Sequence, residues 1–218
     1  MRVVVTGSSS GIGKAVAEMF LEKGHEVIGL DINESSIKDA NYTHYVVDIK
    51  NKEALPEINN VEILFNNAGL QNSIDDIDNN LKGTINVTEK YINNNDALKS
   101  ILFNASASSI SGSEFPLYAA SKAGVVGYMK NLAIRLAPKK VTVNAISLGG
   151  VNTSLNDSVM NDKEKFAKIM DVTPMKKWMD LDEVCDWVYF MTCKNKSASG
   201  QNILIDNGEH DLNDRFVW

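Results

Sequence analysis

The chain has 218 residues, of which 44% are hydrophobic and 23% are charged, and its formal net charge is -6 at pH 7. This length suits one well-packed domain, and the composition excludes a disordered, fibrous or membrane-spanning protein. An acidic chain without a basic stripe is a poor match for a phosphate backbone, so we expect no nucleic-acid partner.

The N-terminus and the cysteines favour a cytoplasmic protein. Met1 leads directly into the apolar run Val3 to Val5, which leaves no room for a secretory signal. No apolar run approaches the roughly 18 residues that a membrane span needs. Cys185 and Cys193 are the only cysteines, and their spacing is not that of metal ligands. We therefore expect buried, reduced thiols, no metal site and no membrane contact.

Apolar runs of strand length alternate with helical segments along the chain. This alternation predicts an α/β fold, a Rossmann-type doubly wound parallel sheet of about seven strands with helices on both faces. No repeat or linker divides the chain, so we expect a single domain over residues 1–218. The predicted strands cover residues 2–6, 26–30, 43–47, 61–65, 100–104, 141–147 and 202–205, and the predicted helices cover residues 12–23, 77–93, 116–136 and 182–192.

A glycine-rich turn follows the first predicted strand and opens the first predicted helix. Residues Thr6 to Gly13 read TGSSSGIG. In this position glycines permit a tight turn, and the helix N-terminus offers N–H groups and a positive dipole end to a pyrophosphate. An ordinary strand-to-helix turn is the alternative interpretation.

The turn resembles that of the short-chain dehydrogenase/reductase family, whose glycine pattern is TGxxxGxG. Further motifs in family order extend the resemblance over nearly the whole chain. It implies a dinucleotide-binding and catalytic domain that transfers hydride between nicotinamide and a small alcohol or carbonyl substrate.

The resemblance also assigns the cofactor contacts. Asp31 closes the second predicted strand, where its carboxylate would accept the adenosine ribose hydroxyls and repel a 2′-phosphate, which favours NAD(H) over NADP(H). Leu148 stands where the family usually has proline, before the segment that lies under the nicotinamide. The implied cofactor-binding residues are Gly7, Ser9, Ser10, Gly11, Ile12, Gly13, Asp31, Ile32, Asp48, Ile49, Asn67, Ala68, Gly69, Tyr118, Lys122, Val151 and Thr153.

Four residues match the catalytic positions of the family. Tyr118 and Lys122 lie four positions apart, so a helix presents both on one face. A phenol with a pKa of about 10 is a poor base, but a nearby ammonium group and the positive nicotinamide ring both favour the phenolate. Ser106 would hold the substrate oxygen, with Ser108 as the alternative register, and Asn80 would hold a relay water through its carbonyl.

The chain departs from the family mainly by shortening the intervals after Asp48 and after Asn67. Residues 150–180 are expected to form a lid whose methionines and aromatic residues suit a substrate with a hydrophobic portion. Identity of the substrate and direction of the reaction do not follow from the sequence. The competing hypothesis is a catalytically idle NAD-binding protein that acts in regulation or by association.

Apolar residues on a second face of two predicted helices indicate self-association. Besides the face toward the sheet, the helices that carry Asn80 and Tyr118 offer further apolar surface, which is typical of an interface. The family resemblance implies a homo-oligomer, a dimer or a tetramer. The apolar tail, Phe216 to Trp218, is a candidate for a second interface or for folding over its own active site.

Overall fold

A seven-stranded parallel sheet forms the centre of the protein. The computed structural model describes residues 1–93, 95–210 and 212, so the tail Phe216 to Trp218 lies outside the described residues. The strand order is β3-β2-β1-β4-β5-β6-β7, and every neighbouring pair is parallel, which confirms the predicted fold class. The strands are β1 (Arg2–Thr6), β2 (Glu26–Asp31), β3 (Tyr42–Val46), β4 (Ile63–Asn66), β5 (Ser100–Asn104), β6 (Thr142–Leu148) and β7 (Asn202–Ile205).

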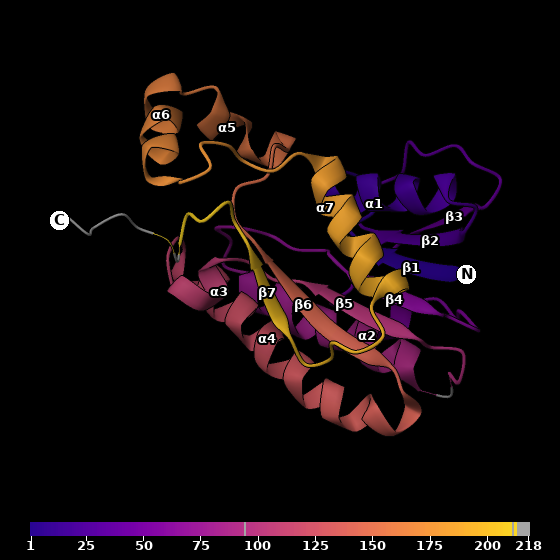
Figure 1. The fold of residues 1–218 in the computed structure, drawn as a ribbon. Coiled ribbons are helices and arrows are strands. Elements are labelled where there is room, and N and C mark those ends of the chain that lie inside the picture. Colours follow the sequence, from indigo (N-terminus) through magenta and orange to yellow (C-terminus); the bar gives the residue numbers. More distant parts are fainter. Residues whose placement is uncertain (94, 211, 213–218) are drawn as a thin grey trace.

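Helices cover both faces of this sheet (Figure 1). On one face Val4 packs with Val87 and Met129, and on the other Val5 packs with Phe20 and Val188. These contacts bury both faces of the central strands, as their continuous hydrophobicity predicts. The helices on the first face are α2 (Thr84–Ile92) and α4 (Pro116–Leu136), and those on the second are α1 (Gly11–Glu22) and α7 (Leu181–Tyr189).

Two predicted helices are interrupted, which corrects the continuous helices expected at residues 77–93 and 182–192. A π-helix, η2 (Ile77–Gly83), precedes α2, and a second, η5 (Phe190–Lys194), follows α7. At η2 a Cβ atom on Gly83 would lie 2.7 Å from the Ile49 side chain, so the helix packs closely against the segment after β3. π-Helical turns frequently occur at functional sites, and Asn80 lies in this one.

Little helix lies beside the edge strand β3, and the shortened interval after Asp48 is one of the two segments concerned. Residues 32–41 between β2 and β3 form no helix, and the only helical turn between β3 and β4 is η1 (Lys52–Ala54). The predicted strand bounds differ from the observed ones by one or two residues at most. Elsewhere the chain adds the 3₁₀ turn η3 (Ala137–Lys139) at the end of α4.

The lid predicted at residues 150–180 contains short helices. They are η4 (Ser154–Asn156), α5 (Asp157–Met160) and α6 (Lys163–Val172), and a further short helix outside the lid, α3 (Ser108–Ser111), precedes α4. Figure 1 shows α3, α5 and α6 around the end of the sheet where β6 and β7 finish. A parallel bridge between Val151 and Met179 closes the base of the lid. Ligands of open parallel sheets bind at this edge.

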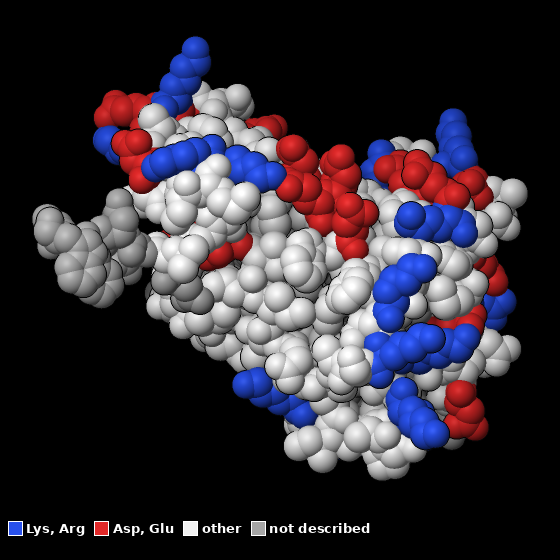
Figure 2. Space-filling view, in the orientation of Figure 1, with Lys and Arg blue, Asp and Glu red and all other residues white. Residues whose placement is uncertain are grey.

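Charged side chains are distributed unevenly over the surface. In Figure 2 acidic side chains gather over the N-terminal half of α7, where Asp182 and Glu183 occupy the first turn. Carboxylates stabilise this end of a helix because its dipole is positive there. Within the described residues no helix is both long and apolar enough to cross a bilayer, and no group of three or more metal-ligating side chains occurs.

Candidate active site

The glycine turn leaves the backbone at the start of α1 accessible. Gly7 has a φ of +69°, which favours glycine, and its N–H donates to the Leu30 carbonyl oxygen at 2.8 Å. A Cβ atom on Gly13 would lie 2.0 Å from the Gly7 carbonyl oxygen, so only glycine lets the helix approach the turn this closely. The turn therefore fits the close approach of a pyrophosphate to the helix N-terminus.

Asp31 is held beside this turn by two backbone amides. The Ser9 N–H donates to Oδ2 at 3.0 Å, and the Asn33 N–H donates to Oδ1 at 2.9 Å. The residue is only 9% exposed. These bonds fix the carboxylate at the end of β2 while each oxygen keeps a lone pair for a ribose hydroxyl. The site thus fits the adenosine half of a dinucleotide.

Two predicted cofactor contacts, Asp48 and Ile49, lie between the end of β3 and helix η2. Ile49 is buried and Asp48 is half-buried, whereas Ile32, the predicted cofactor contact after β2, is exposed. The Asn86 side chain donates to the carbonyl oxygens of Ile49 and Lys50, which ties this segment to α2.

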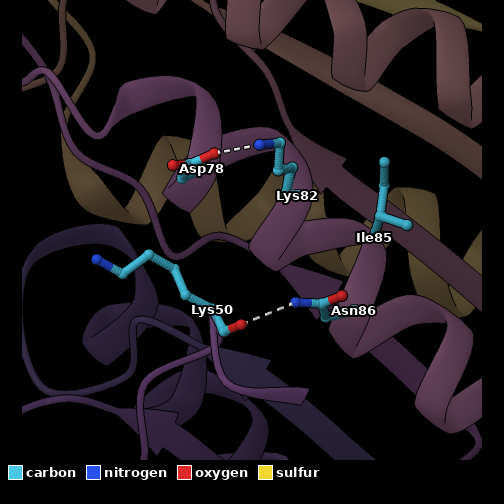
Figure 3. A pocket seen from close by; sticks show the side chains of 5 residues that line it. All are labelled: Lys50, Asp78, Lys82, Ile85 and Asn86. Atoms are coloured by element: carbon cyan, nitrogen blue, oxygen red, sulfur yellow. Dashed lines mark hydrogen bonds and ion pairs between the residues drawn. The ribbon is translucent and has the colours of Figure 1, made fainter.

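A cavity of about 440 Å³ lies next to this segment (Figure 3). Its lining residues are Lys50, Asp78, Lys82, Ile85 and Asn86. In Figure 3 the Lys82 ammonium group points to the Asp78 carboxylate, and the Lys50 ammonium group points away from Asn86. None of these side chains carries a predicted catalytic role, so the cavity is distinct from the centre around Tyr118.

A chain of contacts joins the glycine turn to Lys122. Thr6 Oγ1 accepts hydrogen bonds from the N–H groups of Asn67 and Ala68, both at 2.9 Å. The Asn104 amide donates to Asn67 Oδ1 at 2.9 Å, and Lys122 Nζ donates to the Asn104 carbonyl oxygen at 2.8 Å. Sequence reasoning missed Asn104, although its place as the last residue of β5, next to the strand that ends before Asn67, was a signal for it.

Asn80 connects η2 to α4 and to the loop after Gly69. Its Oδ1 accepts the Leu70 N–H at 2.7 Å, and its Nδ2 donates to the Leu70 carbonyl oxygen at 2.8 Å and to Ser121 Oγ at 3.1 Å. A Cβ atom on Gly69 would lie 3.4 Å from both Asn80 Oδ1 and Lys122 Nζ. The structure therefore brings Asn80 and Lys122 to the same short loop, as the family pattern implies.

Burial controls the protonation of Tyr118 and Lys122. The Lys122 ammonium lies 5.7 Å from the centroid of the Tyr118 ring. Burial lowers the pKa of Lys122 to about 8, although the Asp76 carboxylate opposes this shift. Burial raises the pKa of Tyr118 to about 12, and a hydrogen bond with Ser106 opposes it. Without cofactor, desolvation thus outweighs the expected effect of the ammonium on the phenol.

Ser106 is the serine that contacts Tyr118. It is 6% exposed, and its hydroxyl opposes the rise in the pKa of Tyr118 that burial causes. Ser108 contacts Ser106 and Glu114: its Oγ lies 3.2 Å from Ser106 Oγ and donates a hydrogen bond to the Glu114 carboxylate. The geometry favours the Ser106 register over Ser108. Glu114 was not singled out in the sequence, because no known motif includes it.

The segment after β6 closes the site below the lid. Val151 is buried, and its carbonyl oxygen accepts the Thr153 N–H at 2.9 Å and the Asn156 side chain at 2.8 Å. A Cβ atom on Gly150 would lie 2.0 Å from Trp178 Nε1, so the lid packs directly on this backbone. Leu148, at the position where proline was expected, belongs to β6, and its carbonyl oxygen accepts the Ala107 N–H at 2.9 Å.

Comparison with known proteins agrees with this geometry. A family model described as enoyl-(acyl carrier protein) reductase matches residues 7–210. The chain belongs to the short-chain dehydrogenase/reductase family. This confirms the resemblance seen in the sequence, and the coarse activity follows: the protein is an NAD(P)-dependent oxidoreductase acting on CH–OH groups.

Several relatives cover almost the full chain. The 3-oxoacyl-(acyl-carrier-protein) reductases of Buchnera aphidicola and Thermotoga maritima are each 28% identical, over 94% of this chain and 95% and 96% of their own lengths. A short-chain dehydrogenase family protein of Francisella tularensis is 28% identical with a TM-score of 0.82, covering 95% of this chain and 98% of its own. A 4-hydroxyisoleucine dehydrogenase complexed with NADH is 25% identical with a TM-score of 0.87, covering 97% and 99%.

Proposed function

We propose that this short-chain dehydrogenase/reductase is an NAD(H)-dependent enzyme that interconverts a ketone and a secondary alcohol through Ser106, Tyr118, Lys122 and Asn80. When bound, the nicotinamide supplies or accepts the hydride. The protein itself has to hold the substrate oxygen, move one proton and keep the charged groups in place. A homo-oligomer in the cytoplasm remains part of the prediction from sequence.

The proposed proton donor is Tyr118. Because burial raises its pKa to about 12, the phenol is protonated at neutral pH and can donate to a substrate oxygen that gains negative charge. Ser106, in contact with Tyr118, supports the same oxygen as a second donor. The positive charge of Lys122 then stabilises the phenolate that is left behind.

One observation carries the proposal: a continuous set of contacts links the acid–base pair to the nucleotide turn. Lys122 bonds to the Asn104 carbonyl, Asn104 to Asn67, and Asn67 to the backbone of the turn at Thr6. A cofactor on the turn would therefore be fixed relative to Tyr118, which is the geometry that hydride transfer requires.

The substrate is expected to carry a hydrophobic portion. In the lid, Phe166 packs edge-on against the buried Trp178 with ring centroids 5.1 Å apart, and Met170 is half-buried nearby on α6. Apolar and adaptable side chains of this kind suit such a group. The relatives described above are a 3-oxoacyl-(acyl-carrier-protein) reductase and a 4-hydroxyisoleucine dehydrogenase, so 3-oxoacyl chains and hydroxylated amino acids both belong in a substrate screen.

A turnover screen of ketones and alcohols with NAD(H), read by the absorbance of NADH, tests this proposal. The panel holds 3-oxoacyl thioesters, hydroxysteroids, small diketones and sugar alcohols. We expect turnover of at least one class. If NADH binds and no member of the panel reacts, the catalytically idle NAD-binding protein becomes the better hypothesis.

A further inference from the structure

Three side chains next to Tyr118 form a hydrogen-bond chain with a defined direction. Ser108 Oγ lies 2.5 Å from Glu114 Oε2, and Ser106 Oγ lies 3.2 Å from Ser108 Oγ. An ionised carboxylate only accepts hydrogen bonds, so the single hydroxyl proton of Ser108 points to Glu114. Ser106 must then donate its own proton to Ser108.

This direction conflicts with the role proposed for Ser106. A developing oxyanion on the substrate needs donors, and Ser106 has one proton, which the chain directs away from the substrate. The Ser108 N–H also donates to Ser106 Oγ at 3.2 Å, so the Ser106 oxygen already acts as an acceptor. If the Glu114 end of the hydrogen-bond chain is released, Ser108 can donate to Ser106 and leave the Ser106 proton for the substrate.

Glu114 is available for such an exchange. Its side chain forms no ion pair with any residue in the described part of the chain, and its backbone has a φ of +70°, which is uncommon for a residue other than glycine. The carboxylate lies two hydrogen bonds away from Ser106. A hydroxyl group on the carbon next to the reacting carbonyl can cover that separation.

We propose that Glu114 selects substrates with a hydroxyl group next to the reacting carbon, that is, α-hydroxy ketones and the corresponding vicinal diols. The substrate hydroxyl donates to Glu114 Oε2 and replaces Ser108 as the donor to that oxygen. Ser108 then donates to Ser106, and Ser106 donates to the reacting oxygen. This inference rests on the proposed function, because it assumes that Ser106 and Tyr118 hold a substrate oxygen.

The neighbouring charges disfavour an anionic alternative. Burial raises the pKa of Glu209, His210 opposes this shift, and the carboxylates of Asp206 and Glu114 add to it, so Glu209 lies within the field of Glu114. A substrate carboxylate at this position would meet like charges. The hydroxyl, a neutral hydrogen-bond donor, fits the acceptor that Glu114 presents.

The test compares two ketones that differ by one hydroxyl group, 1-hydroxy-4-phenylbutan-2-one and 4-phenylbutan-2-one, in steady-state reduction with NADH. We expect the wild type to prefer the hydroxy ketone by about tenfold or more in kcat/KM, the scale of one net hydrogen bond to a charged group. In Glu114→Gln the side chain is neutral and can donate to Ser108 as well as accept from it, so the hydrogen-bond chain no longer has one fixed direction. The preference should fall below about threefold and turnover of the plain ketone should rise.

Two further variants make the result specific. Ser108→Ala breaks the hydrogen-bond chain at its centre, so this variant should lose the preference for the hydroxy ketone, as Glu114→Gln does. Glu209 is a neighbouring carboxyl that does not bond to Ser108, so Glu209→Gln should keep the preference. A wild-type preference below about fivefold, or one that survives Glu114→Gln, overturns the inference.

A binding measurement separates this inference from the proposed function. Calorimetry gives the dissociation constants of 4-phenylbutane-1,2-diol and 4-phenylbutan-2-ol for the protein–NADH complex, in which neither alcohol can react. If neither ketone is reduced, the substrate panel described above still decides the proposed function. The inference about Glu114 is then decided by whether the diol binds about tenfold more tightly than the alcohol and loses this advantage in Glu114→Gln.

Discussion

Asp31 receives backbone N–H groups on both carboxylate oxygens, so its negative charge is fixed beside the nucleotide turn. A 2′-phosphate at this position would be repelled, whereas ribose hydroxyls would be accepted. We predict that the protein binds NADH at least about tenfold more tightly than NADPH, and that Asp31→Ala narrows this gap mainly by improving NADPH binding. Fluorescence titration of both nucleotides checks this. Equal dissociation constants of NADH and NADPH for the wild type would contradict the role assigned to Asp31.

Lys122 should impose an upper pH limit on reduction. Its pKa, lowered to about 8 by burial, means that the ammonium is present below that pH and is lost as the pH rises through it. The charge stabilises the Tyr118 phenolate formed when the proton leaves, so we predict that kcat for ketone reduction falls as the pH rises through about 8. The pH profile at saturating NADH measures this. A kcat that stays constant well above that pH contradicts the assignment.

At the level of single residues, spacing in the sequence located the groups that follow a motif and missed those that do not. Tyr118, Lys122 and Gly13 could be predicted because the chemistry requires those residue types at those distances. Asn104 and Glu114 act through contacts between segments far apart in the chain, or through a loop without a pattern. Only the three-dimensional arrangement reveals them.

The pair α2 and α4 is joined by a partly exposed carboxylate. Glu89 on α2 accepts two hydrogen bonds from Arg135 and one from Tyr128, both on α4. Its interaction with Arg135 is the main reason that the pKa of Glu89 is lowered.

We predict that Glu89→Ala lowers the free energy of unfolding by about 1 kcal/mol at neutral pH, a value reduced for the solvent exposure of the pair. Urea unfolding measures it. The matched control is Glu164→Ala, which removes an exposed pair with Lys168 within one turn of α6 and should cost clearly less. An equal loss of unfolding free energy in the two variants would show that the bidentate Glu89–Arg135 contact adds no stability.

Helices and strands could be predicted where the hydrophobic periodicity of the sequence is strong. They could not be predicted where tertiary contacts determine the local conformation. The parallel strands and α4 follow from their apolar patterns. The π-helical turns at η2 and η5 do not, because helical periodicity alone cannot show a one-residue insertion. Helix α6 buries none of its residues, and its apolar stripe is only three residues long, Phe166, Ile169 and Met170, which was too short to single it out.

For the whole molecule, the outer faces of η2, α2 and α4 still predict an oligomer. Leu81, Ile85 and Val126 are half-buried rather than fully covered, on elements that lie on one face of the sheet. We predict a symmetric dimer at least, with the tetramer as the expected form. Light scattering at micromolar concentration measures the mass. A mass equal to that of one chain, 24.0 kDa, would contradict the prediction.

The reaction itself is tested most directly by comparing the wild type with Tyr118→Phe on whichever ketone the screen identifies. The substitution removes the hydroxyl that donates the proton and leaves the ring packed in its place. We predict that NADH oxidation falls by about 10²-fold or more, while the dissociation constant of NADH stays within about twofold. A variant that keeps most of the wild-type kcat would show that Tyr118 is structural and would contradict the proposed function.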